Sequence, residues 1–222
     1  MFTFKTEQGE GRGYLAAPAS GSGPGMLVLH AWWGLTPFFT EVCDRLAEAG
    51  FVALAPDLHH GQTAATVAEA EALVKQSEGP GFARTQAVAT SALAQLRAHP
   101  AVQRTAVGVL GFSMGAAWAN MLVSQAPEDI AAVVLFYGSY SVDFTQTRAA
   151  FLGHFADADE WEPMESVRDM EAAIRAAGRE VTLHLYPGAG HWFFESNQPD
   201  AYQPEAAALA WERTMEFLRR SL

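Results

Sequence analysis

The fold of this chain is decided by Thr105-Ala106-Val107-Gly108-Val109-Leu110-Gly111-Phe112-Ser113-Met114-Gly115. Its first half is a short apolar run, typical of a strand covered on both faces, and small helix-forming residues follow its last glycine. A G-x-S-x-G sequence between a strand and a helix is typical of a sharp turn that projects the serine hydroxyl clear of the sheet. We therefore predict that Ser113 is a nucleophile held in a strained turn.

A serine hydroxyl is a weak nucleophile, so it needs a base and an acid that orients the base. Downstream, one predicted strand ends just before the carboxylates Asp157 and Asp159. A later β-rich run breaks at a Pro-Gly loop that delivers His191. We predict that Ser113, Asp159 and His191 are catalytic, with Asp157 as the alternative acid. The order Ser, Asp, His along a chain is that of α/β-hydrolases.

Acyl transfer also needs N–H donors for the oxyanion. The residue after the nucleophile normally supplies one backbone N–H, and the loop after an early strand supplies the other. These positions are occupied by Met114 and Trp32. The predicted oxyanion donors are therefore the backbone N–H groups of Met114 and Trp32.

Alternating buried strands and helices predict an α/β fold, with a mostly parallel, twisted sheet of about seven to eight strands and an antiparallel start. Strands are expected near 2–6, 12–16, 26–30, 51–55, 105–110, 130–136, 149–154 and 180–186, and helices near 37–49, 82–98, 114–125, 163–177 and 202–220. The segments 57–81 and 137–147 are expected to be irregular. We expect one domain over residues 1–222 with no large lid domain.

The composition narrows the class of partner. The formal net charge is −11, and no basic cluster is present, which argues against nucleic acid and anionic membranes as partners. No run is long enough to span a bilayer and no secretory signal is apparent, so a cytoplasmic location is expected. The single cysteine, Cys43, is expected to pack within an amphipathic helix.

Several separate segments, in order, resemble the dienelactone hydrolase family of α/β-hydrolases over nearly the whole chain. The matching residues are Gly13–Pro18, Trp32–Leu35, Ala55–Leu58, Gly111–Gly115, Phe136–Gly138, Tyr186–His191 and the final pattern around Ala206, Arg213-Thr214 and Phe217-Leu218. The resemblance implies an α/β-hydrolase that cleaves esters or lactones.

Three positions depart from the family pattern. Where that family has a nucleophilic cysteine, a glutamate and a substrate-binding arginine, this chain has Ser113, Ala31 and Glu195. A carboxylate in place of a guanidinium repels an anionic lactone, which favours a neutral ester. We therefore predict a serine hydrolase that cleaves small to medium carboxylic esters or lactones.

The predicted substrate contacts are Trp33, Tyr137, Trp192 and Glu195, the alternative being that the aromatic side chains only seal the core. The spacing of His30, His59 and His60 matches no standard metal motif, which favours roles in turns. We expect no metal and no cofactor, and a small-molecule substrate as the partner.

Two other functions remain open from the sequence. An acyltransferase or perhydrolase would use the same acyl-enzyme and differ only in the acceptor. A non-catalytic binding protein on a hydrolase scaffold would have lost a catalytic residue, and none of the three is missing. The oligomeric state is left open by the sequence.

Overall fold

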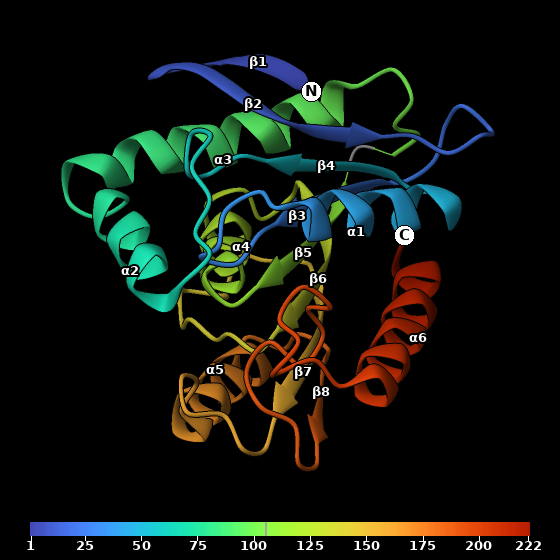
Figure 1. Cartoon of the computed structure of the whole chain (residues 1–222). Helices are drawn as coiled ribbons and strands as arrows, with labels where there is room; N and C mark the ends of the chain where they lie inside the picture. Colours follow the sequence, from blue (N-terminus) through green and yellow to red (C-terminus); the bar gives the residue numbers. More distant parts are fainter. Residues whose placement is uncertain (105) are drawn as a thin grey trace. The chain divides into compact units, whose positions relative to one another are not determined.

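The computed structural model describes residues 1–104 and 106–222. The chain divides into two compact units, Met1–Val107 and Gly108–Leu222. Among the described residues there are eight strands and six helices, which alternate along most of the chain (Figure 1). The predicted α/β class is confirmed. The strand predicted over 105–110 begins at Thr105, which lies outside the described residues.

The first unit contains four strands in the order β1-β2-β4-β3. Their bounds are β1 Phe2–Thr6, β2 Gly9–Ala16, β3 Gly25–Leu29 and β4 Val52–Pro56. The pairs β1–β2 and β2–β4 are antiparallel, and β3–β4 is parallel. The predicted antiparallel start is therefore present. Every residue of β3 and β4 is buried, because helices cover both faces of these central strands.

Three helices complete this unit: α1 Pro37–Glu48, α2 Val67–Gln76 and α3 Pro80–Ala98. Both α1 and α3 pack against strands β2, β3 and β4. The side chain of Cys43 is buried on the inner face of α1, as an amphipathic pattern predicts, and burial raises the pKa of its thiol.

The second unit contains the strands β5 Val107–Phe112, apart from its first residue, β6 Ile130–Phe136, β7 Ala150–Ala156 and β8 Val181–Tyr186, in that order. The pairs β6–β7 and β7–β8 are parallel. Its helices are α4 Met114–Gln125, α5 Met164–Ala176 and α6 Pro204–Ser221. Helix α4 packs on β6, α6 on β6 and β7, and α5 on β8.

One helix contradicts the sequence prediction. The segment 57–81 was expected to be irregular, yet α2 occupies Val67–Gln76. A capping box begins this helix: the Thr66 side chain accepts from the Glu69 N–H, and the Glu69 carboxylate accepts from the Thr66 N–H. Only Ala70 and Leu73 are buried, so the segment lacks the apolar periodicity on which the prediction depended.

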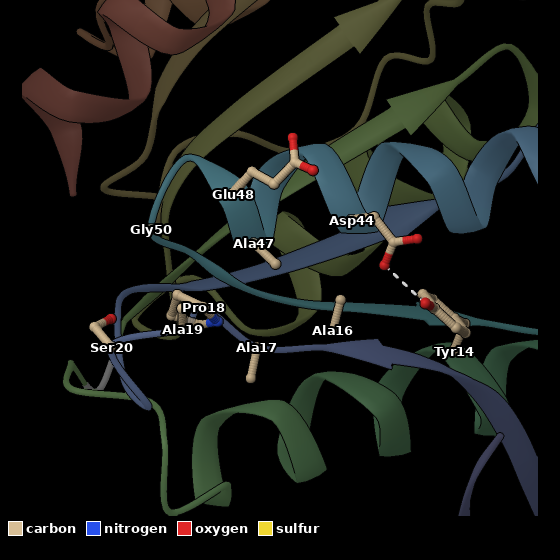
Figure 2. A pocket seen from close by; sticks show the side chains of 10 residues that line it. All are labelled: Tyr14, Ala16, Ala17, Pro18, Ala19, Ser20, Asp44, Ala47, Glu48 and Gly50. Atoms are coloured by element: carbon tan, nitrogen blue, oxygen red, sulfur yellow. Dashed lines mark hydrogen bonds between the residues drawn. The ribbon is translucent and has the colours of Figure 1, made fainter.

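An open groove of about 690 Å³ lies between β2 and α1 of the first unit (Figure 2). Tyr14 of β2 donates its hydroxyl hydrogen to Asp44 of α1, at 2.7 Å, and Glu48 lies one turn further along α1. None of the residues that line this groove is one of the predicted site residues.

Within the described ranges, we find no helix that combines the length and apolar character needed to traverse a bilayer.

Candidate active site

The nucleophile elbow joins β5 to α4 with Ser113 at its apex. Ser113 has φ 51° and ψ −115°, a conformation that is strained for a residue with a side chain. Two glycines allow the chain to pack this closely. A Cβ on Gly111 would lie 2.5 Å from the carbonyl oxygen of Gly115, and one on Gly138 would lie 2.5 Å from the carbonyl oxygen of Ser113. The turn therefore requires glycine at both positions.

The second unit brings Ser113, His191 and Asp159 into one hydrogen-bonded chain. The Oγ of Ser113 lies 2.8 Å from Nε2 of His191. On the other side of the imidazole, Nδ1 lies 2.7 Å from Oδ2 and 2.9 Å from Oδ1 of Asp159. Because a carboxylate only accepts, Nδ1 carries the proton and Nε2 accepts from the serine hydroxyl. This is the arrangement in which an imidazole can remove the serine proton.

Backbone N–H groups two and three residues along the chain also hold the carboxylate of Asp159. Its Oδ1 accepts from the N–H groups of Trp161 at 2.8 Å and Glu162 at 2.9 Å. Asp157 has a different contact: its Oδ1 accepts from the Gly188 N–H at 2.6 Å, on the loop that leads to His191. The structure thus places Asp159 on the imidazole and Asp157 on the loop backbone.

A contact between Glu162 and Ser139, which was not predicted from the sequence, holds the loop that carries Asp159. The Glu162 carboxylate accepts from the backbone N–H of Ser139 at 3.0 Å and from the Ser139 hydroxyl. Burial raises the pKa of Glu162, although these hydrogen bonds oppose the shift. No local sequence signal points to this contact, because Ser139 lies 23 residues away in sequence. Glu162 therefore links the loop that follows β6 to the loop that carries Asp159.

Aromatic rings enclose the imidazole of His191. The Tyr137 ring lies 5.0 Å from it, and the Trp192 ring meets it edge-on at 4.9 Å and 89°. Tyr137 and Trp192 both have positive φ, of 38° and 64°. These packed rings restrict how far the imidazole can turn away from Ser113.

The buried pair Tyr137 and Glu195 lies behind His191. The Tyr137 hydroxyl donates to Oε1 of Glu195 at 2.8 Å, and both side chains are fully buried. Burial raises the pKa of Glu195 to about 8, so its carboxyl is protonated at neutral pH. The prediction that the Glu195 carboxylate repels an anionic lactone therefore needs correction, because burial keeps this carboxyl group neutral.

The predicted substrate contacts differ in exposure. Trp192 lines a hollow of about 240 Å³ that also includes His191, together with Trp161, Glu160 and Asp200. Tyr137 and Glu195 present no surface to this hollow, because they lie in the core. Of the predicted contacts in the second unit, only Trp192 therefore lines the hollow beside the imidazole.

Trp32 and Trp33 belong to the first unit, in the loop after β3. Their rings meet edge-on at 5.4 Å, and Trp33 is 3% exposed. Two buried histidines contact the same loop: Nδ1 of His30 lies 2.7 Å from the Ala31 carbonyl oxygen, and Nε2 of His59 lies 3.1 Å from that of Trp32. Within the described part of the chain, no group of three or more His, Cys, Asp or Glu side chains is arranged to hold a metal ion.

Several known proteins are similar in sequence to this chain. The sequence model of the dienelactone hydrolase family matches residues 12–222. Protein usf of Aquifex pyrophilus is 31% identical, covering 100% of this chain and 98% of the relative. Carboxymethylenebutenolidase of Pseudomonas sp. is 30% identical over 93% of this chain and 89% of the relative.

A solved structure shares the fold. It is the dienelactone hydrolase-like promiscuous phosphotriesterase P91 from metagenomic libraries, with a TM-score of 0.84 at 21% identity, covering 99% of this chain and 98% of that one. Such a likeness over both units indicates the same mostly parallel eight-stranded sheet flanked by helices. With the family match across both units, we conclude that the chain is a hydrolase of the dienelactone hydrolase family, with the α/β-hydrolase fold.

Proposed function

We propose that this protein hydrolyses small to medium carboxylic esters or lactones through an acyl-enzyme formed on Ser113. One observation carries the proposal: Ser113 Oγ lies 2.8 Å from His191 Nε2, while Nδ1 of the same ring lies 2.7 Å from Asp159. Relatives named carboxymethylenebutenolidase support an ester or lactone as the substrate.

In the first half of the reaction, Nε2 of His191 takes the proton of Ser113 as Oγ attacks the carbonyl carbon. Asp159 stabilises the imidazolium that forms, because its carboxylate faces the protonated Nδ1. The tetrahedral intermediate then collapses, and His191 returns the proton to the departing alkoxide. The products of this half are the free alcohol and an ester of Ser113.

In the second half, water replaces the alcohol. His191 removes a proton from the water, hydroxide adds to the acyl carbon, and Ser113 leaves with the proton that His191 returns. A lactone gives a single hydroxy acid, since its alcohol and acyl groups belong to one molecule. The proton transfers in both halves use only His191, which Asp159 orients.

Two backbone N–H groups are assigned to the oxyanion. Met114 is the first residue of α4 and directly follows the nucleophile. Trp32 follows β3, where this fold class supplies its second donor, and its assignment rests on that place in the sequence. Preorganised donors of this kind typically contribute about 10²- to 10³-fold each to kcat.

Substitutions at the three residues test the proposal with p-nitrophenyl acetate as the substrate. Ser113→Ala should lower kcat by about 10⁴-fold or more, because it removes the hydroxyl that lies on Nε2 of His191. Asp159→Asn should lower kcat by about 10³- to 10⁴-fold, because an amide favours the wrong imidazole tautomer. Asp157→Asn is the matched control: its Oδ1 can still accept from Gly188, so kcat should stay within about threefold of wild type.

Labelling with a fluorophosphonate checks the nucleophile directly. Wild type should gain one adduct on Ser113, and Ser113→Ala should gain none. Full turnover by Ser113→Ala, or equal losses from the two aspartate substitutions, would contradict the assignment.

A further inference from the structure

The loop Ala31–Gly34, after β3, is held through its carbonyl groups. The carbonyl oxygen of Ala31 accepts from the Gly34 N–H at 3.2 Å and lies 2.7 Å from Nδ1 of His30. The next carbonyl oxygen, of Trp32, lies 3.1 Å from Nε2 of His59. Two imidazoles therefore contact two successive peptide groups of this loop.

The tautomer of His30 follows from its partners. The backbone N–H of Leu58 donates to its Nε2 at 3.0 Å, so Nε2 cannot carry a proton. The neutral ring therefore has its proton on Nδ1, which donates to the Ala31 carbonyl oxygen. The ring is fully buried, and burial, with a smaller effect from His59, lowers the pKa of His30 to about 3. His30 thus keeps one protonation state throughout the neutral range.

His59 has the opposite tautomer. Its Nε2 faces the carbonyl oxygen of Trp32, which only accepts, so Nε2 carries the proton. Burial also lowers the pKa of this imidazole. Its ring lies 5.2 Å from that of His30, so the two neutral rings pack against each other. Each ring presents one N–H to one loop carbonyl.

The hydrogen bond from His30 Nδ1 to the Ala31 carbonyl oxygen matters because of the geometry of that peptide group. Ala31 C=O and Trp32 N–H belong to one planar peptide group, and no peptide bond among the described residues is cis. In a trans peptide these two bonds point in opposite directions, so a donor that fixes the carbonyl also fixes the direction of the N–H.

We propose that His30 is a positioning residue, which orients the Trp32 N–H by donating its Nδ1–H to the carbonyl of the same peptide. The proposal rests on the proposed function, in which that N–H stabilises the oxyanion. His59 supports the following peptide in the same manner. His30 is not placed to act as a general base, since its other ring nitrogen, Nε2, already accepts from the Leu58 N–H.

Substitution by Asn or Gln tests the two ring nitrogens of each histidine separately. The side-chain nitrogen of Asn occupies the position of Nδ1, and the terminal atoms of Gln reach the position of Nε2. His30→Asn therefore keeps the donor to Ala31, whereas His30→Gln keeps only the acceptor for Leu58. We expect kcat for p-nitrophenyl acetate to fall about 10- to 100-fold in His30→Gln, with a much smaller change in KM. His30→Asn should retain most of the wild-type kcat, because it keeps the donor to Ala31.

The same pair at His59 should give the reverse order. His59→Gln keeps a donor to the Trp32 carbonyl, and His59→Asn loses it. A merely structural role would instead lower the thermal midpoint without this Asn–Gln difference in kcat, so the thermal midpoint of each variant is measured alongside. Equal kcat losses in Asn and Gln at position 30 would overturn the inference.

A measurement on the unmodified protein covers the case in which a variant does not fold. Nitrogen chemical shifts of the His30 ring should show the proton on Nδ1, and a proton on Nε2 would overturn the inference. The Ser113→Ala control separates this test from the proposed function. Turnover that does not depend on Ser113 refutes both, whereas Ser113-dependent turnover with no Asn–Gln difference refutes only the role of His30.

Discussion

At the scale of single residues, Glu195 is a buried carboxyl group that destabilises the second unit. Its Oε1 accepts from Tyr137, but its buried Oε2 has no hydrogen-bond partner. A buried polar atom without a partner destabilises a fold by roughly 1–3 kcal/mol. Because Tyr137 packs on His191, the glutamate supports the wall behind the imidazole. The destabilising Oε2 atom of Glu195 thus belongs to the packing around the candidate catalytic residues.

The pKa of Glu195 predicts how stability depends on pH. It is about 8 in the folded chain against 4.5 for an ordinary glutamate, so between these values the folded state holds a proton that the unfolded state has lost. Stability is therefore fully present below pH 4.5 and is lost as pH rises through about 8, by about 1.4 kcal/mol per pH unit. Glu195→Gln, which cannot ionise, should remove this loss.

Thermal unfolding at pH 5, 7 and 9 measures the effect. The midpoint of Glu195→Gln should exceed that of wild type by more at pH 9 than at pH 5. Glu212→Gln, at an exposed position of α6, is the control for loss of a charge and should show no such trend. A constant difference between Glu195→Gln and wild type at all three pH values would be evidence against a protonated Glu195.

At the scale of elements, helix α2 depends more on the capping box at its N-terminus than on packing against the core. It buries only Ala70 and Leu73, so little apolar area favours it over a loop. The capping box of Thr66 and Glu69 satisfies N–H groups that the first turn leaves without helical partners. Helix-forming residues such as alanine and glutamate then favour its continuation.

Removal of the cap should loosen this element. Thr66→Ala should lower the local stability of α2 by about 1 kcal/mol, because the Glu69 N–H loses its acceptor. Thr66→Ser keeps a hydroxyl and should restore most of it. Amide hydrogen exchange within Val67–Gln76 reports the change, and unaltered exchange in Thr66→Ala would show that packing alone maintains the helix.

At the scale of the whole molecule, buried histidines in both units make the fold sensitive to acid. His154 lies in the core between the Tyr186 hydroxyl, 2.8 Å from its Nδ1, and the Thr214 hydroxyl, 3.0 Å from its Nε2. Burial, then His184 and Arg213, lowers its pKa well below 6.5. Like His30, it remains neutral when folded, although the unfolded chain takes up a proton below pH 6.5.

Lowered folded-state pKa values give stability that is present above pH 6.5 and lost as pH falls. Each buried histidine should cost about 1.4 kcal/mol per pH unit in the acid range. His154→Gln should be less stable than wild type at pH 7, yet its stability should fall less steeply between pH 6 and pH 4.5. Urea unfolding at several pH values gives both slopes, and parallel slopes would argue against a neutral His154.

Much of the fold could be predicted because its signals are local. The apolar run before Ser113, the glycines of the elbow and the Pro-Gly break before His191 depend on neighbours in sequence. Strand and helix bounds therefore agree with the structure to within a few residues, except at α2, which has too narrow a buried face to give a periodic pattern.

The features of the site that could not be predicted depend on contacts between residues far apart in the sequence. Asp157 and Asp159 lie two residues apart after the same strand, and only the fold shows which carboxylate meets the imidazole. The burial of Glu195 depends on Tyr137, 58 residues away in sequence. No local pattern encodes such a pairing, so the charge of Glu195 was misjudged from its residue type.

The position of Cys43 has a practical consequence. The chain contains no other thiol, and this one is buried and kept protonated in α1. Alkylating reagents attack the exposed thiolate, so they should leave the native fold unmodified. A Ser113→Cys exchange would then create a single reactive sulfur, which a maleimide or a fluorescent iodoacetamide could mark without background.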